Sequence, residues 1–196
     1  MSISRLHLLN YLIDYCGYRN YLEIGSANGD TIRNVRCTHR IGVDPNSSLG
    51  IRASSDDYFA NSKGKFGLIF IDGDHRCEQV LRDILNSLDH LTVDGTIVVH
   101  DCLPLDVEET RQIANRGGMY TGDGWRVIAS MSRFPQLDVV VGNFDHGCAI
   151  IKQRPNPFSD GPAFPPSIRS WSWAQYEQAL LFPILSWPEV ARWIAQ

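Results

Sequence analysis

The pattern of apolar positions switches repeatedly along the chain between the period of a helix face and the short runs typical of a strand. Near the start, apolar residues recur at spacings of three and four, which predicts an N-terminal helix over residues 1–17. Further along, short apolar runs alternate with helical patterns. The runs expected to form strands are residues 20–24, 40–43, 51–53, 66–71, 96–99, 137–141 and 148–151. This alternation is typical of an α/β fold.

The clearest unit lies in the middle of the chain. Residues 66–71 form an unbroken apolar run, as expected for a central strand that is buried on both faces of a parallel sheet. A helical pattern follows, and then the strand at 96–99. Such a unit predicts parallel strands joined by a right-handed crossover. The last two runs are joined by a loop too short for a crossover, and they predict an antiparallel hairpin.

Capping and turn signals predict further helices. Asp106 with Glu109 resembles a capping box and predicts a helix that ends near Gly117. Asp123 is expected to cap another helix. A helix is also expected to start near residue 28 and to run past Val35.

The expected organisation is a single domain over residues 1–196. Within it we distinguish a core at 20–152, a proline-rich segment at 153–170 and C-terminal helices at 171–196. Five of the ten prolines fall within residues 153–166, which excludes a regular helix or an inner strand there. We expect this segment to be extended and to run over the surface.

Composition and charge narrow the class of protein. Hydrophobic residues make up 43% of the chain and charged residues 20%, which excludes a disordered protein. The net charge of −4 disfavours a general nucleic-acid binder. The sequence contains no run of about 18 apolar residues, so it predicts no transmembrane helix. The N-terminus lacks the apolar centre of a signal peptide, and the five cysteines contain no C-x-x-C pair, so we expect reduced thiols in a cytoplasmic protein.

Unusual polar residues and glycines follow four of the expected strands, at their carboxyl ends. In an open α/β sheet, ligands bind at this edge. The sequence motifs at these ends are EIGSANG at 23–29, GVDP at 42–45, FIDGDH at 70–75 and VHDC at 99–102. We therefore expect a ligand site where these four motifs meet.

Gly25 and Gly29 lie between the first strand and the next helix, where a ligand can approach bare backbone. Their spacing matches neither the P-loop nor the dinucleotide pattern, and a tight turn without a ligand is the alternative interpretation. Asp44 lies nineteen positions after Gly25. A carboxylate there can accept hydrogen bonds from both hydroxyls of a ribose, although it can also start an Asp-Pro turn. Together these residues favour a nucleoside ligand.

The four motifs, in this order, resemble those of class I S-adenosylmethionine (SAM)-dependent methyltransferases. The chain is most similar to the small O-methyltransferases of methyltransferase family 24, over residues 20–151. That family has a Rossmann-like, doubly wound and mostly parallel sheet of seven strands with a C-terminal antiparallel hairpin, which agrees with the shape predicted from the residue pattern. The resemblance implies SAM as the cofactor and methyl transfer to a hydroxyl of a small or glycan-linked acceptor, with a sugar hydroxyl as the expected group.

The resemblance also implies roles for individual residues. Those expected around the cofactor are Glu23, Gly25, Ser26, Gly29, Asp44, Ser55, Asp56 and Asp72. The first four would surround the methionine part, and Asp44 would hold the ribose. The adjacent serine and aspartate that follow the third expected strand would lie beside the adenine. Asp72 would open onto the methyl group and the acceptor.

A divalent metal is a further expectation at the acceptor side. Asp72 and Asp101 end strands that should be neighbours, about 5 Å apart, and together with His100 they could hold Mg²⁺ or a similar cation. Related metal-dependent O-methyltransferases have an acidic–amide or acidic–acidic pair where this chain has His100–Asp101. Imidazole suits manganese or zinc better than magnesium, so the choice among Mg, Mn and Zn stays open. In the alternative interpretation the two aspartates only cap loops, with His100 packed beside them.

His75 is the expected general base. In related enzymes a lysine or histidine stands at this place, next to the acceptor hydroxyl. A histidine with the ordinary pKa of about 6.5 can accept a proton at neutral pH. The alternative is that His75 only begins the next helix and binds backbone.

Two other functions stay open on sequence alone. One is an NAD-linked oxidoreductase on a similar sheet, which the missing third glycine of the dinucleotide pattern disfavours. The other is a non-catalytic nucleoside-binding module, which the presence of Asp72, His75 and Asp101 disfavours. The expected partner is a small-molecule or glycan acceptor, with no nucleic acid and no membrane. The aromatic residues near the C-terminus could serve a homodimer contact.

Overall fold

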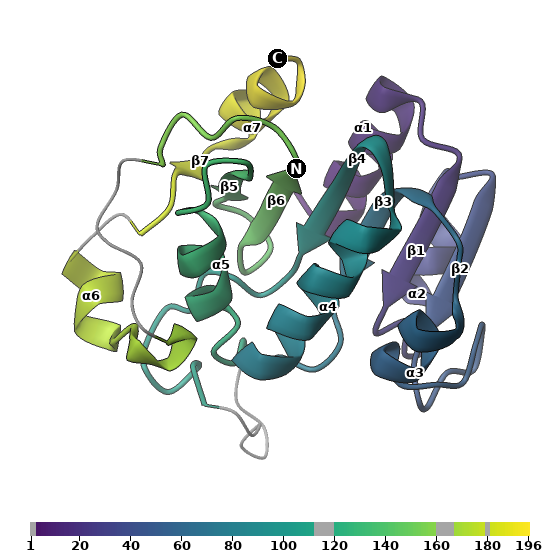
Figure 1. The fold of residues 1–196 in the computed structure, drawn as a ribbon, viewed down its shortest axis with the longest axis horizontal. Helices are drawn as coiled ribbons and strands as arrows, with labels where there is room; N and C mark the ends of the chain where they lie inside the picture. The colour runs from purple at the N-terminus through teal and green to yellow at the C-terminus, as the bar shows by residue number, and fades with distance from the viewer. Residues whose placement is uncertain (1–2, 112–119, 160–166, 179–180) are drawn as a thin grey trace.

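A computed structural model describes residues 3–111, 120–159, 167–178 and 181–196. These residues form one seven-stranded sheet with the order β2-β1-β3-β4-β6-β5-β7 (Figure 1). The strands are β1 (Asn20–Ile24), β2 (His39–Val43), β3 (Phe66–Ile71), β4 (Leu91–Val99), β5 (Asp138–Gly142), β6 (Cys148–Lys152) and β7 (Ile184–Leu185). The first four are parallel, β6 is antiparallel to both of its neighbours, and β7 runs parallel to β5. The structure confirms the Rossmann-like sheet and its antiparallel hairpin.

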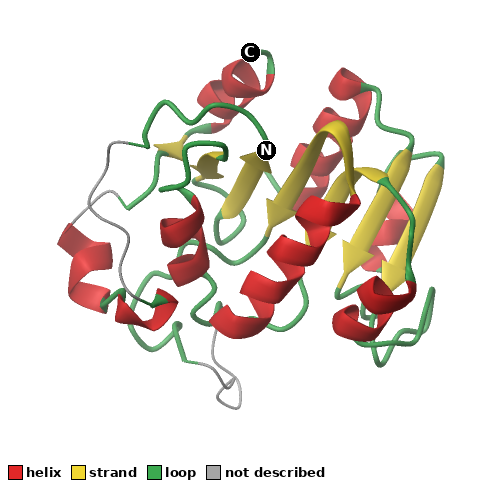
Figure 2. Cartoon of the chain, viewed as in Figure 1, coloured by secondary structure: helices red, strands yellow, loops and turns green. Residues whose placement is uncertain are grey.

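Helices cover both faces of this sheet. They are α1 (Arg5–Cys16), α2 (Asp30–Asn34), α3 (Ser55–Asn61), α4 (Cys77–His90), α5 (Trp125–Met131), the short 3-10 helix η1 (Ile168–Ser170), α6 (Trp173–Gln178) and α7 (Trp187–Ile194). In Figures 1 and 2, α3, α4 and α5 lie in front of the sheet and α1 and α2 lie behind it. None of the helices in the described ranges is long and apolar enough to cross a membrane.

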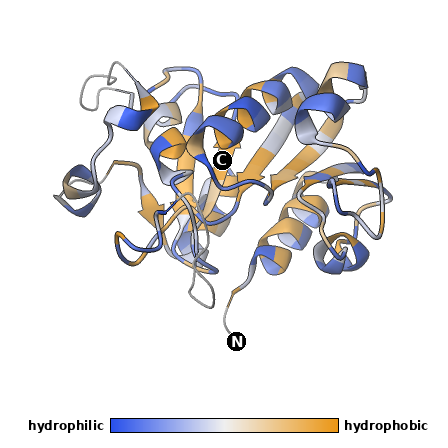
Figure 3. Ribbon diagram, turned by 90° about the horizontal axis from the view of Figure 1, so that it is seen from below, coloured by the Kyte–Doolittle hydropathy of each residue, from blue (hydrophilic) through white to orange (hydrophobic). Residues whose placement is uncertain are grey.

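Burial on both faces explains the unbroken apolar run of β3. Ile69 and Ile71 belong to the core that α4 and α5 cover, whereas Leu68 and Phe70 belong to the core that α1 and α7 cover. Successive side chains of a strand point to opposite faces, so a strand between two helical layers needs apolar residues at every position. Figure 3 shows the same division, with apolar stripes on the helices and mostly apolar central strands.

Polar side chains fix the helix starts on both faces. The Ser4 hydroxyl accepts from the His7 amide at the start of α1, and the Ser54 hydroxyl accepts from the Asp57 amide at the start of α3. Ser186 and Glu189 form a reciprocal capping box at α7, as the sequence predicts. Such contacts satisfy amides that have no partner inside the helix.

One predicted strand is wrong, although the number of strands is right. The run at 51–53 makes only an isolated bridge between Ile51 and Val43. The seventh strand is instead β7, which the sequence analysis assigned to the C-terminal helices. The carbonyl of Pro183, the residue before β7, accepts from the Val141 amide. The segment therefore joins the sheet edge by backbone hydrogen bonds, which its side chains do not predict.

The helix predicted from Asp106 is also wrong as far as residue 111, and residues 112–119 lie outside the described residues. One capping contact does form, since Asp106 Oδ1 accepts from the Glu109 amide at 3.0 Å, while the Glu109 carboxylate accepts from the Leu105 amide at 2.8 Å. However, the Glu109 carbonyl accepts from the amides of Thr121 and Gly122, at 3.1 and 3.0 Å. That carbonyl is thereby diverted from helical pairing, and residues 107–110 form a turn.

Two helix ends differ from the prediction. The α2 helix ends at Asn34, and Val35 is already extended. Asp123 does not cap α5, whose N-cap is Gly124. Asp123 Oδ1 instead accepts from the Cys77 amide at 2.7 Å. This contact gives a partner to an amide in the first turn of α4, which has none inside the helix.

Candidate active site

A cavity of about 450 Å³ opens at the carboxyl edge of the parallel strands. Its volume lies in the range of small-molecule and cofactor sites. Gly25 follows β1, Asp44 follows β2 and Asp72 follows β3, and all three line the cavity together with Ser55 from the start of α3. Four of the eight residues predicted around the cofactor therefore share one cavity wall.

Gly25 brings the ends of β1 and β3 into direct contact. Its φ is +88°, and a Cβ atom there would lie 2.2 Å from the Asp72 carbonyl oxygen. Only glycine fits such a position, because any side chain would push the two strand ends apart. The glycine therefore keeps Asp72 beside the first loop and leaves bare backbone at the cavity wall.

The Asp44 carboxylate is held in place by backbone amides. Its Oδ2 accepts from the Ala27 amide at 3.1 Å, and its Oδ1 accepts from the Asn46 amide at 2.7 Å. Each carboxylate oxygen has two lone pairs, so both retain capacity for a further donor. A fixed double acceptor at the cavity wall suits the two hydroxyls of a ribose.

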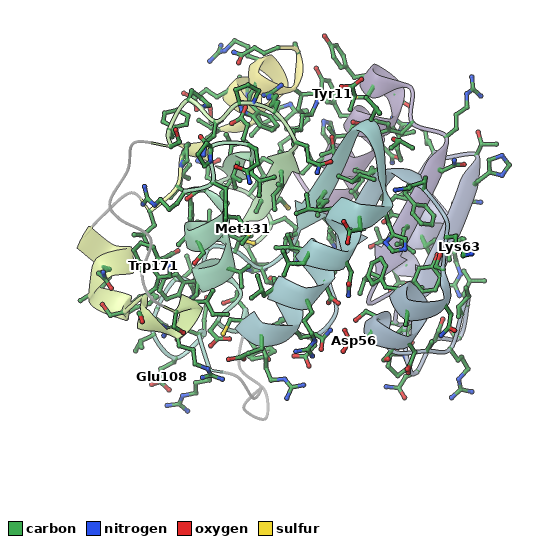
Figure 4. The ribbon with its side chains drawn as sticks, in the orientation of Figure 1. Tyr11, Asp56, Lys63, Glu108, Met131 and Trp171 are labelled. Carbon is green, nitrogen blue, oxygen red and sulfur yellow. The ribbon has the colours of Figure 1, made fainter. Side chains whose placement is uncertain are left out.

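The other four predicted cofactor residues lie outside the cavity wall. Ser26 is buried, with its hydroxyl 3.5 Å from that of Ser47. Gly29 is the N-cap of α2. Asp56 is in the first turn of α3, beside α4 (Figure 4), and its Oδ2 lies 3.2 Å from Arg82 Nε.

Glu23, the fourth of these residues, lies on the opposite face of β1 from the apolar residues Leu22 and Ile24. It shares that face with Tyr21, whose hydroxyl donates to Glu23 Oε2 at 2.7 Å. The side chain is buried, and burial raises the pKa of Glu23 to about 7 against the opposing effect of the Tyr21 hydrogen bond. The alternation of side chains along β1 therefore places Glu23 on the face of the sheet that α1 covers.

Four ionisable residues gather beside the cavity, at the ends of β3 and β4. His100 Nδ1 lies 3.2 Å from Asp72 Oδ1 and 3.3 Å from Asp101 Oδ1. His75 Nδ1 lies 3.4 Å from Asp101 Oδ2, and its Nε2 lies 3.8 Å from Asp72 Oδ1. The structure thus brings together the predicted base and all of the predicted metal ligands.

The charges of this cluster stabilise one another. Burial by itself lowers the pKa of His100, but contacts with Asp101, Asp145 and Asp72 outweigh it and raise the pKa to about 11. Burial by itself raises the pKa of Asp72, but His100, His75 and Arg5 lower it to about 2. An opposite charge within a few ångströms favours the ionised form of each partner.

Arg5 and Asp145 complete the cluster, and the sequence analysis missed both. Arg5 Nε lies 3.7 Å from Asp72 Oδ2, and His100 Nε2 lies 3.7 Å from Asp145 Oδ1. The Arg5 amide donates to Asp145 Oδ2 at 2.6 Å. These residues come from the start of α1 and from the β5–β6 loop. The only sequence signal is the Asp145-His-Gly147 turn, which says nothing about what the loop contacts.

Residues with strained backbone concentrate around this edge. Ala27, Asp101, Asp145 and His146 all have positive φ without being glycine. Such residues cost free energy and persist only where their surroundings fix them, which is common at functional sites. Here the carbonyls of His146 and Gly147 accept from the amides of the loop after Asp101, so each loop holds the other.

His75 is oriented by the loop that precedes α5. The ring of Tyr120 stacks on the His75 ring with a centroid separation of 5.2 Å and an interplanar angle of 12°. The His75 carbonyl accepts from the Asp123 amide at 3.2 Å, and a Cβ at Gly122 would lie 2.5 Å from the His75 Cβ. His75 therefore has a fixed ring plane as well as fixed backbone.

The donor set fits a divalent transition ion. Asp72, His75 and Asp101 each offer a ligand atom, and these atoms lie within 4.8 Å of one another. This grouping contains His75, whereas the sequence analysis named His100. Both imidazoles lie within reach of the same two carboxylates, and mixed imidazole and carboxylate ligands suit manganese or zinc.

Comparison with known proteins gives a family match over part of the chain and a shared fold over most of it. Residues 28–102 match the model of methyltransferase family 24, described as a methyltransferase domain. A search of the curated proteins finds no match. Among solved structures, the cofactor-bound protein Rv0187 from MTB is 18% identical with a TM-score of 0.58, and the alignment covers 80% of this chain and 83% of that one.

Two further solved structures share the fold. An O-methyltransferase from Bacillus cereus in complex with SAH is 14% identical with a TM-score of 0.53, covering 78% of this chain and 82% of that one. The N-methyltransferase NodS from Bradyrhizobium japonicum WM9 is 16% identical with a TM-score of 0.51, covering 78% and 94%. Because oxygen- and nitrogen-directed enzymes both have this fold, the fold by itself does not identify the acceptor atom.

Proposed function

We propose that this chain is a class I SAM-dependent methyltransferase, as the partial family match and the shared fold suggest, and that it transfers the methyl group of SAM to a hydroxyl oxygen of a small acceptor. The observation that carries the proposal is the cavity of about 450 Å³ whose wall joins Gly25, Asp44 and Ser55 and ends at Asp72, beside His75 and Asp101. The family match favours this activity over the NAD-linked oxidoreductase.

The cofactor would lie along the cavity from α3 to the strand ends. We assign Asp44 to the ribose hydroxyls, Ser55 to the adenine end and the Gly25 backbone to the methionine part. Asp72 would lie at the sulfonium, where a carboxylate favours the positive charge. Ser26 and Gly29 would shape the first loop, Glu23 would support it from beneath, and Asp56 would hold α3 against α4.

The proposed reaction needs a base and an aligned acceptor. An oxygen lone pair of the acceptor attacks the methyl carbon, the carbon–sulfur bond breaks, and its electron pair neutralises the sulfonium to give S-adenosylhomocysteine (SAH). The acceptor proton passes to His75 Nε2, the ring nitrogen that faces Asp72. Stacking on Tyr120 fixes the ring, so much of the acceleration would come from positioning.

We also propose that transfer is metal-assisted. Asp72, His100 and Asp101 would hold the ion, and His75 is the further ligand that the geometry allows. A divalent ion there would supply Lewis-acid activation of the acceptor hydroxyl. His75 cannot serve as ligand and base in the same state, so the experiment below separates the two roles.

The test measures methyl transfer from labelled SAM to a panel of glycosides, phenols and amines, with Mg²⁺, Mn²⁺ or Zn²⁺ and with a chelator. We propose glycosides as the methylated class, on the resemblance alone. We expect His75→Ala to lower turnover by at least about 100-fold, the size of a general base, while SAH still protects the protein in thermal unfolding. NAD should give no such protection.

The outcomes separate the roles. Loss of turnover with metal affinity retained in His75→Ala supports the base, and loss of metal affinity makes His75 a ligand instead. The same measurement on His100→Ala tests the predicted ligand set. Unchanged turnover in His75→Ala contradicts the proposed base. Protection by NAD and not by SAH contradicts the proposed function.

A further inference from the structure

Helix α4 presents a polar stripe to the cavity. Arg76, Gln79 and Asp83 line the cavity wall at spacings of three and four, which is one face of a helix. The neighbouring positions Val80 and Ile84 are buried in the core between α4 and the sheet. Arg76 pairs with Asp74, and Gln79 Nε2 donates to Ser55 Oγ, so these two residues have polar partners.

Asp83 is the residue of this stripe that lacks a complete set of partners. Its side chain has no exposed surface. Its Oδ1 accepts from Gln79 Nε2 at 3.0 Å, and the nearby Ser55 hydroxyl lowers the Asp83 pKa, but its buried Oδ2 has no partner at hydrogen-bond distance and angle among the described residues. A buried acceptor without a donor carries the full cost of its desolvation, so this oxygen is expected to have a donor in the ligand-bound protein.

The surroundings determine which ligand group could supply that donor. Gln79 Nε2 already donates to Ser55 Oγ at 3.0 Å as well as to Asp83. An amide nitrogen has two hydrogens, so these contacts use both. At this end the cavity therefore offers a vacant acceptor, in Asp83 Oδ2, and no spare amide donor from Gln79. A ligand amino group suits such a wall, and a ligand carbonyl oxygen does not.

We propose that Asp83 accepts a hydrogen bond from the exocyclic amino group of the cofactor's adenine and so makes the cavity selective for adenosine over inosine. The inference rests on the proposed function, since it takes SAM as the ligand and the Ser55 end as the adenine end. In this arrangement Asp44 holds the ribose at the end of β2, and Asp83 on α4 contacts the edge of the adenine that carries the amino group.

The first test uses the unmodified protein and two ligands. SAH carries the amino group, and S-inosylhomocysteine carries an oxygen in its place. Calorimetric titration at about pH 8 keeps Asp83 ionised, because burial raises its pKa only to about 6. We expect SAH to bind at least about tenfold more tightly, the effect of one lost hydrogen bond and an uncompensated buried acceptor. Equal affinities for the two ligands would overturn the inference.

The second test changes the wall. Asp83→Asn keeps the shape but gives the wall a donor, so the preference for SAH should fall to within about threefold or reverse. Asp89→Asn makes the same chemical change at an exposed position of the same helix, and it should keep the wild-type ratio. Thermal unfolding without ligand confirms that each variant is folded.

The outcomes also separate this inference from the proposed function. If SAH binds and Asp83→Asn keeps the wild-type ratio, Asp83 has only a structural role while the methyltransferase assignment stands. If the wild-type protein binds neither nucleoside, the proposed cofactor is wrong and the inference fails with it.

Discussion

At the scale of single residues, Glu23 links stability to pH. Its pKa rises from 4.5 in an unfolded chain to about 7 in the fold, first because of burial. Between these two values the native protein holds a proton that the unfolded chain has released. Unfolding then releases that proton, so rising pH favours the unfolded state. The stability that protonated Glu23 contributes to the fold is therefore lost as the pH rises to about 7.

We predict that Glu23→Gln removes this dependence. Stability should be nearly unchanged at about pH 4, where the carboxyl group is protonated in both states. At about pH 8 the variant should be more stable by up to about 3 kcal/mol, since each pKa unit corresponds to about 1.4 kcal/mol. Denaturant unfolding of both proteins across this range measures the difference. Parallel stability curves would show that Glu23 is not the group responsible.

Glu23 also shows how far a motif can predict a site. Its place in the first motif suggested contact with the cofactor, yet β1 is a strand and its side chains alternate. Tyr21 and Glu23 face α1, whereas Ile24 lines the cavity. Asp44 and Asp72 directly follow their strands, so their position at the strand ends predicts that they line the cavity. Glu23 lies inside its strand, where the motif alone does not show which face its side chain takes.

At the scale of elements, the turn after β1 depends on one glycine. A Cβ at Gly25 would meet the Asp72 carbonyl oxygen at 2.2 Å, whereas a Cβ at Gly73 has its nearest neighbours at 3.6 Å, an ordinary contact. The two glycines lie side by side at the same sheet edge and so form a matched pair.

We predict that Gly25→Ala lowers the free energy of unfolding by about 3 kcal/mol and abolishes measurable SAH binding. The alanine must either push the ends of β1 and β3 apart or leave its φ of +88°, and both changes disturb Asp72. Gly73→Ala should lower the free energy of unfolding by less than about 1 kcal/mol. Thermal and denaturant unfolding compare the two variants, and equal losses would refute the assigned contact.

The elements that the sequence predicted well are those whose burial is complete. Strand β3 is apolar at every position because helices cover both of its faces, and its unbroken apolar run records that burial directly. The turn at 107–110 shows the opposite case. Its capping residues are correct for a helix, but two amides from residues 121 and 122 take the Glu109 carbonyl, and a local pattern contains no record of that contact.

At the scale of the whole molecule, the candidate site joins segments that are distant in the sequence. Arg5 and Asp145 are separated by 140 positions, and they meet through the hydrogen bond from the Arg5 amide to Asp145 Oδ2. Neither residue stands in a recognisable motif. Only the folded structure brings the start of α1 and the β5–β6 loop together at His100 and Asp72, so the sequence could not indicate this half of the cluster.

We predict that Asp145→Asn lowers the rate of methyl transfer by at least about tenfold while the affinity for SAH changes less than about threefold. Asp145 contacts Arg5 and His100 but lies outside the cavity wall, so its loss should disturb the reacting edge more than cofactor binding. Steady-state kinetics and calorimetry measure the two effects. The exposed Glu177→Gln on α6 serves as control, and a reduced affinity with unchanged turnover would reverse the assignment.

The layer behind the sheet is built from both ends of the chain. Leu8, Leu9 and Leu12 of α1 share one core with Val190 and Trp193 of α7. Because α1 precedes α7 in the chain, a nascent protein holds α1 against the sheet strands before α7 can complete this core. The half of the site that includes Arg5 therefore gains its complete support only when α7 docks, so a chain truncated before α7 should leave α1 incompletely packed.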